Sequence, residues 1–420
     1  MSDTGWKWSS GTGGFVPKGF LFGTHRTTPP AETLARFKGV AGRMGITRLA
    51  DVTGLDYLGV PVVMACRPNA RSLSVSQGKG LDRDAALASG FMEAAETFHA
   101  EHIDRPVRLA SRAEFSRRHR VAELRPLPRL QGPSPTERTE LPWIEAFDLL
   151  DGSPAWIPYD LVHTDYREPR PPWSRYFPTS SNGLASGNHP LEATCAALCE
   201  VIERDASTLW QLRSGDERAG RRIDPDTVND PACRMLIDRL HACGMLLSIW
   251  DTTTDVGIAA FVCRIREARD NRRAALRPFW GMGCHLARGI ALSRAITEAV
   301  QTRLTFISGS RDDLERHEFT ESSEAKLYDL ATLLWERQTP ARRFTEVPDS
   351  AHRDFDGDLA EILDRLRAVD IEHVYVVDLT RPDLGIPVVH AVVPGLEYAH
   401  DVPGYRLGDR ARRLQRGEVL

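Results

Sequence analysis

Three separated segments of the chain place acidic residues at fixed intervals after a glycine-rich stretch. The segments span residues 76–96, 181–204 and 281–303. In the first two, a glycine precedes one glutamate by 13 residues and a second glutamate by 16. The glycine is Gly80 or Gly187, and the glutamates are Glu93 with Glu96 and Glu200 with Glu203. Because the spacing recurs, we interpret these segments as repeats that present carboxylates in the same way.

The third segment follows this pattern with one change of residue type. Aligning its helix on Glu298 puts an amide, Gln301, where the other segments have a second glutamate. Four residues before the first acid stand Ser89, Ala196 and Arg294. Residues four apart share a helix face, so we expect Arg294 and Glu298 to point the same way.

The surroundings of these acids favour a site over a solvated surface. Successive helical residues are about 100° apart, so Glu93 and Glu96 lie about 60° apart. Glu192, Glu200 and Glu203 likewise fall within about 80° of one another. The flanking residues are small and apolar, without lysine. Buried carboxylates close together cannot all stay ionised without cations, and hard oxygen ligands in number indicate Mg²⁺ with phosphate oxygens completing its shell.

Basic residues near the acids suit the phosphates of a nucleotide. The candidates are Arg204 and Arg294, then Lys79 and Arg26. We expect the glycine-rich turns to let the backbone approach a ligand closely. These turns contain Gly78, Gly80, Gly183 and Gly187. A single pair of glutamates three apart is usually a surface feature of little energetic weight, but three helices in matching register favour a site.

A second set of repeats predicts the elements that position these segments. Each consists of an amphipathic helix, a strand ending in Asp-x-Thr, a turn with glycine and a second apolar strand. The shared residues are Asp51/Thr53/Gly59, Asp251/Thr253/Gly257 and Asp378/Thr380/Gly385. Asp and Thr hydrogen-bond turns and glycine supplies a positive φ, so we interpret these residues as structural. We predict an α/β (α+β) fold of repeated hairpin, glycine-rich strand and helix units, with mixed or antiparallel sheets.

Composition and charge argue against several classes of protein. The 420 residues, 41% of them hydrophobic, can bury a large core. A net charge of −4 argues against nucleic-acid binding as the main task. No run of 18 apolar residues and no signal-peptide pattern occur, so we expect a cytoplasmic protein without a membrane span. Seven cysteines, without a CxxC pair, argue against a disulfide framework.

Taken together, the acidic segments resemble the YcaO family. The resemblance rests on SVSQGKGLDRDAALASGFMEAAE, SSNGLASGNHPLEATCAALCEVIERDA and ALSRAITEAVQTRLTFISGSRDD, which follow the family's order. It runs through residues 20–310, and the hairpin repeats extend it to 400. We therefore divide the chain into a flexible N-terminus (1–20), a YcaO domain (21–400) and a C-terminal tail (401–420). Within the domain we expect an ATP-binding core (70–315) and a C-terminal α/β portion (345–400).

The resemblance implies that ATP and Mg²⁺ bind among glutamates from several helices. Residues that match the family's metal-binding acids are Glu93, Glu96, Glu192, Glu200, Glu203 and Glu298. Residues that match its nucleotide contacts are Arg26, Thr33, Lys79, Ser89, Asn182, Arg204 and Arg294. Arg26 and Thr33 are assigned from the interval of seven residues between them. Arg294 and Glu298 are the residues that we expect to take part in catalysis.

The activity that the resemblance implies is ATP-dependent activation of a backbone amide in a ribosomally made precursor peptide. A nucleophile adds to the carbonyl, the oxyanion attacks the γ-phosphate, and phosphate leaves with the former amide oxygen. External sulfide would give a thioamide, and a Cys, Ser or Thr side chain would give an azoline ring. No protein nucleophile is needed.

The C-terminal sequence favours the thioamide. Azoline-forming members typically end in a PxPxP tail, whereas this chain ends in RARRLQRGEVL. GTHRTTPPAETL, SGSRDD and VVPGLEYAHDVPGYRLG resemble the TfuA-associated branch, for which a TfuA-like or other leader-binding partner is expected. Homodimers are common in the family. An azoline-forming cyclodehydratase remains the alternative.

Two other classes of protein fit the residues less well. A non-catalytic scaffold with a degenerate nucleotide site would not need to retain the acids and Arg294. A metal-dependent hydrolase would usually recruit histidine ligands, and the 13 histidines form no HExxH motif. We interpret His99 and His102 as a solvated helix end.

Overall fold

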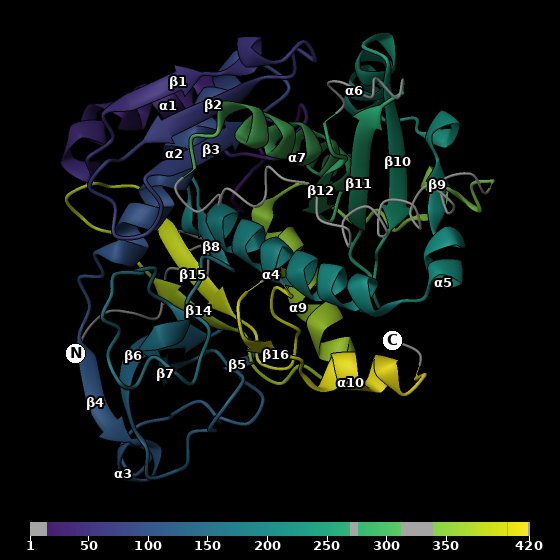
Figure 1. Cartoon of the computed structure of the whole chain (residues 1–420). Coiled ribbons are helices and arrows are strands. Elements are labelled where there is room, and N and C mark those ends of the chain that lie inside the picture. The colour runs from purple at the N-terminus through teal and green to yellow at the C-terminus, as the bar shows by residue number, and fades with distance from the viewer. Residues whose placement is uncertain (1–14, 269–275, 312–338, 401, 419–420) are drawn as a thin grey trace.

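Three copies of one structural unit organise the part of the chain that the computed structural model describes, residues 15–268, 276–311, 339–400 and 402–418 (Figure 1). Each unit has a helix, a hairpin, a glycine-rich strand and a long helix. The first unit contains α1 (Pro30–Phe37), β1 (Arg48–Asp51), β2 (Val62–Cys66), β3 (Val75–Lys79) and α2 (Arg83–Glu101). The third contains α6 (Pro231–Ala242), β10 (Met245–Asp251), β11 (Ala260–Glu267), β12 (Phe279–Cys284) and α7 (Arg288–Ser308).

The second unit is assembled from two distant parts of the chain. Its glycine-rich strand β8 (Leu184–Ser186) and long helix α4 (Pro190–Leu212) come from the middle. Its other helix and its hairpin come from the C-terminal part: α9 (Phe355–Ala368), β14 (Tyr375–Asp378) and β15 (Val388–Val392). Strand β15 pairs antiparallel with β8. Figure 1 shows the yellow hairpin beside the teal strand that it completes.

All three units share one strand register. The hairpin residue three positions after the turn glycine lies opposite the last residue of the glycine-rich strand. The opposed pairs are Val62 with Lys79, Val388 with Ser186 and Ala260 with Cys284. Each strand residue precedes the first acid of its helix by 14 positions, the acids being Glu93, Glu200 and Glu298. The alignment of the third segment on Glu298 is therefore confirmed, and His285 stands where the other units have glycine.

The hairpin turns of the three units are also built alike. In each, the threonine N–H donates to the aspartate Oδ1, with N···O distances of 3.1, 2.9 and 2.9 Å. The threonine Oγ1 accepts from the next strand's first N–H at 3.2 Å. The turn glycines have φ of 63°, 72° and 69°. The structural role predicted for these residues is confirmed.

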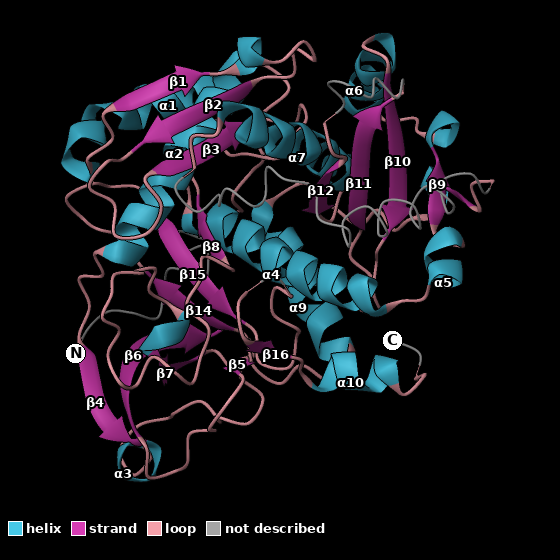
Figure 2. Ribbon diagram, viewed as in Figure 1, coloured by secondary structure: helices cyan, strands magenta, loops and turns pink. Residues whose placement is uncertain are grey.

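Each unit contacts both of the others, and α4 and α7 lie between the sheets of the units (Figure 2). Each glycine-rich strand contacts the long helix of its own unit and also the long helix of one other unit. These contacts between units join β3 to α7, β8 to α2 and β12 to α4. Glycine allows β3 to pack closely on α2 of its own unit, because a Cβ on Gly78 would lie 2.1 Å from the Ala86 carbonyl oxygen and the Gly90 nitrogen. The prediction that these glycines let a ligand approach the backbone is therefore wrong for Gly78, because α2 occupies the space beside it. A Cβ on Gly183 would similarly meet the Ala391 carbonyl oxygen at 2.3 Å.

Further strands extend the sheets of the second and third units. The second unit's sheet has the order β4–β6–β14–β15–β8, and β7 pairs with β6. The third unit's sheet has the order β12–β11–β10–β9–β13, in which β13 and β9 are parallel. The added strands are β4 (Val107–Ser111), β6 (Glu140–Asp148), β7 (Ser153–Pro158), β9 (Arg222–Asp224) and β13 (Arg342–Arg343). The predicted α/β class with mixed or antiparallel sheets is confirmed.

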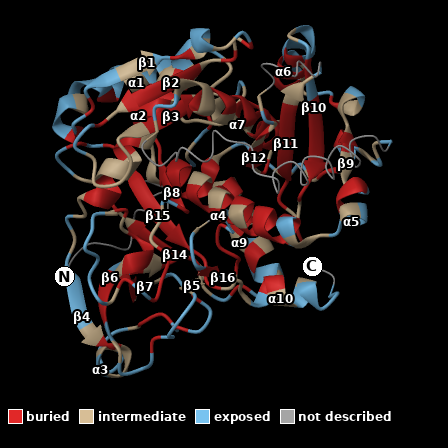
Figure 3. Ribbon diagram, in the orientation of Figure 1, coloured by how far each residue is buried: buried red, intermediate tan, exposed pale blue. Residues whose placement is uncertain are grey.

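Shorter elements complete the described chain: α3 (Arg112–Phe115), β5 (Arg129–Leu130), α5 (Gly215–Ala219), β16 (Tyr405–Arg406) and α10 (Asp409–Gln415). Helix α4 is buried along most of its length (Figure 3). Lys18 Nζ lies 2.6 Å from Asp358 Oδ2 on α9, while residues 1–14 of the predicted flexible N-terminus lie outside the described residues. The predicted domain boundaries remain predictions. Among the described helices, none is both long and apolar enough to cross a membrane.

Candidate functional site

The acids of the long helices meet where the three units join. The carboxylate of Glu96 on α2 interacts electrostatically with Glu93 and with Glu200 on α4. Glu200 interacts in turn with charged groups of its own helix and of α7: Glu203, Arg204, Arg294 and Glu298. We call Glu93, Glu96, Glu200, Glu203 and Glu298 the acid cluster. The structure thus brings together five of the six predicted metal-binding acids with Arg204 and Arg294.

Lys79 fills the junction between β3 and α7. Its Nζ lies 2.7 Å from Glu298 Oε2 and donates at 3.1 Å to Gln301 Oε1. The Gln301 amide Nε2 donates to the Gln77 carbonyl oxygen at 2.7 Å. The Lys79 N–H lies 3.4 Å from the hydroxyl of Ser89. In the third unit, Gln301 stands where the other units have a second acid. There the ammonium group of Lys79 contacts both Glu298 and Gln301.

Backbone and hydroxyl donors hold the other carboxylates. Ser186, at the end of β8, donates from its N–H at 2.8 Å and from its hydroxyl at 2.7 Å to Glu96 Oε1. The Gln77 N–H donates to Glu93 Oε1 at 3.2 Å, and the Met282 N–H donates to Glu298 Oε1 at the same distance. Gln77 and Met282 occupy the same register position in their units, so the repeat extends to the contacts of the acids.

Glu203 and Arg294 keep unused hydrogen-bonding capacity at the junction between β12 and α4. Glu203 is 3% exposed, and its Oε1 lies 3.7 Å from Nη2 of Arg204. Its Oε2 and the Nε of Arg294 are buried and have no hydrogen-bond partner within the described residues. Buried polar atoms without partners are costly in folded proteins. They mark this junction as the place where a polar ligand could be received.

Burial and neighbouring charges set the ionisation of the acid cluster. Burial raises the pKa of Glu96 to about 8, and the neighbouring Glu93 and Glu200 add to this rise. Burial likewise raises the pKa of Glu200 to about 7 and raises the pKa of Glu93. Burial opposes ionisation of Glu298 as well, but Lys79, Arg204 and Arg294 outweigh it and lower the pKa of Glu298. The cluster thus contains carboxylates that need further positive charge to ionise at neutral pH.

Glu192, at the start of α4, has its hydrogen-bond partners outside the acid cluster. Its carboxylate accepts hydrogen bonds from Arg26 Nη1 at 3.3 Å and from the N–H and hydroxyl of Thr27 at 2.9 and 2.7 Å. Thr33 accepts from the side-chain amide of Asn188 at 2.9 Å. Eight helical residues separate Glu192 from Glu200, about 12 Å along the axis. Arg26 and Thr33 therefore contact residues at or just before the start of α4, and the metal role of Glu192 stays a prediction.

Asn182 lies beside β8, where its polar side chain is also incompletely satisfied. Its backbone carbonyl is 3.0 Å from His390 Nε2, and the residue is 6% exposed. Its side-chain Oδ1 is buried without a hydrogen-bond partner in the described structure. The predicted nucleotide contact of Asn182 stays a prediction.

The donor chemistry of the cluster fits a hard divalent cation with an anionic ligand. Carboxylate oxygens are the ligands that Mg²⁺ prefers, and the arginines complement phosphate. Over the described residues, no group of three or more His, Cys, Asp or Glu side chains lies close enough to hold a metal ion. The carboxylates of Glu96 and Glu298 accept instead from Ser186 and Lys79. The metal-binding role of each acid accordingly stays a prediction.

The histidine pair at the end of α2 differs from expectation. His99 is fully buried, and its Nδ1 lies 2.7 Å from the Ala95 carbonyl oxygen. Burial lowers the pKa of His99 to about 4. His102 stacks on Phe98 with ring centroids 4.5 Å apart. The interpretation as a solvated helix end is therefore wrong for His99, which is a core residue.

The chain belongs to the YcaO family. The family's sequence profile, described as YcaO cyclodehydratase, ATP- and Mg²⁺-binding, matches residues 77–397. This range contains the entire acid cluster with Arg204 and Arg294. Membership places the chain among ATP-dependent enzymes and confirms the prediction of ATP and Mg²⁺ as cofactors at the level of the family.

Two relatives are similar to this chain over most of its length. An uncharacterized protein in the tfuA 3′ region of Rhizobium leguminosarum bv. trifolii is 39% identical over 401 residues, covering 93% of each chain. An uncharacterized protein of Methanothermobacter thermautotrophicus is 35% identical over 387 residues, covering 91% of this chain and 97% of the relative. The first of these supports the TfuA-associated branch.

Solved structures confirm the fold. YcaO from Methanopyrus kandleri, bound with AMPPCP and Mg²⁺, superposes with a TM-score of 0.70 at 20% identity, covering 94% of this chain and 98% of its own. A heterocyclase in complex with substrate and cofactor has a TM-score of 0.76 at 23% identity. That match covers 97% of this chain, which spans 57% of the heterocyclase chain.

Several residues of the site escaped the sequence analysis. Gln77, Ser186 and Thr27 donate to Glu93, Glu96 and Glu192, respectively. Ser186 occupies the register position of Lys79, so aligning the strands as well as the helices would have drawn attention to it. Thr27 carries no such signal, because its partner stands 165 residues further along the chain.

Proposed function

We propose that this chain activates a backbone amide of a ribosomally made peptide by moving the γ-phosphoryl group of ATP onto the amide oxygen. The observation that carries the proposal is the convergence of the acid cluster with Arg204 and Arg294 where three units join. Glu93, Glu96, Glu200, Glu203 and Glu298 would hold Mg²⁺, which neutralises the triphosphate. Arg204, Arg294 and Lys79 would bind phosphate oxygens, with Ser89 and Asn182 bordering the nucleotide.

We propose that the nucleotide site extends beyond the acid cluster to the start of α4, where the predicted nucleotide contacts Arg26 and Thr33 lie. Arg26 contacts Glu192, and Thr33 contacts Asn188, just before α4. We propose that Glu192, whose metal role stays a prediction, also holds Arg26 toward the nucleotide through their ion pair, N···O distance 3.3 Å. This positioning role adds to the metal role that the family resemblance implies for Glu192.

The chemistry that this site would serve balances without a protein nucleophile. A sulfur or oxygen nucleophile forms a bond to the amide carbon and the C=O π electrons move onto oxygen. That oxygen forms a bond to the γ-phosphorus as the bond to ADP breaks. The C–O bond then breaks and releases phosphate, and the nucleophile loses its proton. Preorganised positive charge around the transferring phosphoryl group is what the protein must supply.

We favour a thioamide product, made with a TfuA-like partner that binds or supplies the peptide substrate. The relative in the tfuA 3′ region supports this choice. An azoline ring is the second candidate, because the family is described as cyclodehydratases. Mass spectrometry of a co-expressed precursor peptide separates them. A thioamide exchanges one oxygen for sulfur, whereas an azoline loses one water.

Nucleotide binding is the direct test of the site. In Glu203→Gln, the carboxylate charge disappears at almost constant volume, and we expect Mg²⁺-AMPPCP to bind at least about tenfold more weakly in isothermal titration. Glu145→Gln, an exposed residue on β6, is the matched control and should bind as the wild type does. Equal affinity of the Glu203 variant and the wild type would contradict the proposed site.

A further inference from the structure

The C-terminal segment, residues 396–400 and 402–415, packs on α4 beside the proposed site. Asp205 is two residues after Glu203, about 200° around the helix, so the two carboxylates point to opposite sides. Asp205 Oδ1 accepts from the Glu397 N–H at 2.8 Å, and Thr208 donates to the Tyr398 carbonyl oxygen at 2.7 Å. The segment therefore holds the back of the helix whose front carries the acids.

Arg410 is the centre of this contact. Its Nε and Nη2 bind both carboxylate oxygens of Asp205, at 2.9 and 3.1 Å. Its Nη1 donates to Asp255 Oδ2 at 3.2 Å, and Nη2 also contacts Asp255 Oδ1. The side chain of Asp205 is fully buried and that of Arg410 is 6% exposed. Since Asp255 lies in the turn between β10 and β11, Arg410 joins α4 to the hairpin of the third unit.

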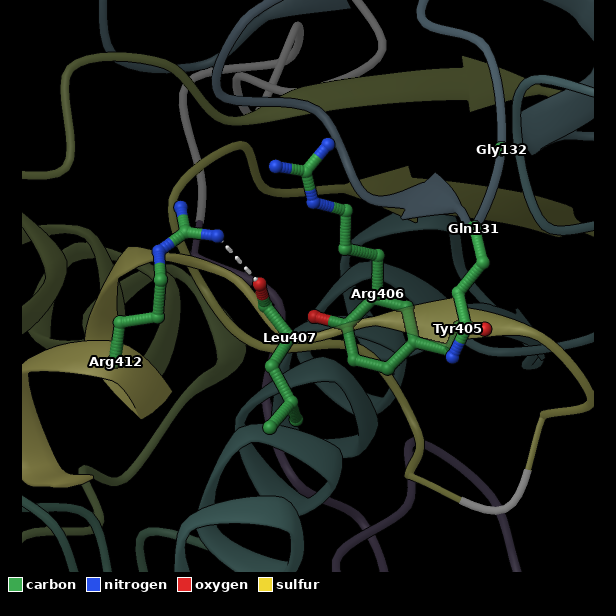
Figure 4. Close-up of a pocket in the computed structure, with 6 residues that line it drawn as sticks. All are labelled: Gln131, Gly132, Tyr405, Arg406, Leu407 and Arg412. Atoms are coloured by element: carbon green, nitrogen blue, oxygen red, sulfur yellow. Dashed lines mark hydrogen bonds between the residues drawn. The ribbon is translucent and has the colours of Figure 1, made fainter.

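A buried carboxylate fixes the segment that carries Arg410. Glu397, 1% exposed, accepts from the Tyr405 hydroxyl at 2.8 Å and from the N–H groups of Gly408 at 2.7 Å and Ala411 at 2.8 Å. These bonds set the start of α10. On its outer side the segment borders a surface pocket of about 490 Å³, over which Arg406 and Arg412 extend (Figure 4). Arg410 is not among the residues that line this pocket; it points inward.

Arg410 joins α4 to the third unit, and both of these supply charged side chains to the acid cluster. Helix α4 carries Glu203 and Arg204, and α7 of the third unit carries Arg294 and Glu298. We propose that Arg410 is a positioning residue, which orients Glu203 and Arg204 against α7 by tying Asp205 to Asp255. This role rests on the proposed function. Sites of this kind require side chains to be held within about 0.5 Å of their working geometry, so a bidentate tie one residue from Arg204 matters.

The test removes the tie without leaving a buried charge. We would combine Arg410→Met with Asp205→Asn, because a lone buried Asp205 would destabilise the fold. The control combines Arg67→Met with Glu101→Gln. Arg67 and Glu101 form an equally buried pair, 3% and 0% exposed, that lies within the first unit. Isothermal titration with Mg²⁺-AMPPCP and thermal unfolding would be measured on both proteins and on the wild type.

For the Arg410 double variant, we expect at least about tenfold weaker nucleotide binding, and wild-type affinity for the control. Equal affinity losses in both double variants would show a general stability effect and overturn the positioning role, as would wild-type affinity of the Arg410 variant. Should that variant not fold, Arg410→Lys keeps the charge but not the bidentate contact. It should bind more weakly than the wild type, and unchanged affinity would overturn the role. A wild type that binds no nucleotide would contradict the proposed function itself.

Discussion

Among single residues, Glu96 carries the clearest consequence of burial. Its pKa of about 8 lies above the ordinary value of 4.5. Between these values the folded state binds more protons than the unfolded state, so the stability of the cation-free protein falls as the pH rises. We expect the urea midpoint without Mg²⁺ to decrease from about pH 5 to about pH 8.

Glu96→Gln is the control for that decrease. The amide cannot ionise, so the variant should show a flatter pH dependence over the same range. Glu200, whose pKa is about 7, would account for the part that remains. A wild-type midpoint that is constant or rises across this interval would contradict the assignment of a raised pKa to these carboxylates.

The residues of the acid cluster could be found from the sequence because their spacing is local. Intervals of 13 and 16 residues after a glycine identify Glu93 and Glu96, and the same intervals identify Glu200 and Glu203. Glu192 is grouped with them by its angle on the helix and by the family resemblance, and this grouping stays a prediction. Its partners Arg26 and Thr27 stand in a distant loop, and no local pattern in the sequence indicates that contact.

At the scale of elements, the glycine-rich strands determine how closely each long helix can approach. Gly78→Ala would place a methyl group 2.1 Å from backbone atoms of α2, where no flexible side chain can move aside. We expect a loss of about 3 kcal/mol or more in the free energy of unfolding, measured by urea denaturation.

Gly42→Ala provides the comparison for the strand glycine. Gly42 lies in a short 3₁₀ helix, Lys38–Met44, and a Cβ there would meet no atom within 4 Å. Its φ is not positive, so alanine should stabilise the protein by up to about 1 kcal/mol. Similar effects of the two substitutions would show that close strand–helix packing is not what requires Gly78.

The hairpins were predictable as elements, but their partners were not. Each Asp-x-Thr and glycine turn has a local signature, and all three turns form with the same hydrogen bonds. For the first and third units, the glycine-rich strand follows its hairpin directly in the chain. Strand β8 instead pairs with β15, whose residues come about 200 positions later. Because sequence proximity carries no information on such a pairing, only the structure shows that the C-terminal repeat completes the second unit.

At the scale of the whole molecule, the contacts among the three units predict which strands nucleotide binding at the acid cluster should stabilise. A ligand held by α2, α4 and α7 contacts all three units, and each of β3, β8 and β12 packs on two of these helices. At a nucleotide concentration of 100 times the dissociation constant, binding adds about 2.7 kcal/mol to the stability of the folded state. We therefore expect Mg²⁺-AMPPCP to slow hydrogen exchange in β3, β8 and β12 together, measured by mass spectrometry of peptides. Glu203→Gln at the same nucleotide concentration should show little of this protection. Protection confined to a single unit would mean that the nucleotide does not bind where the three units join.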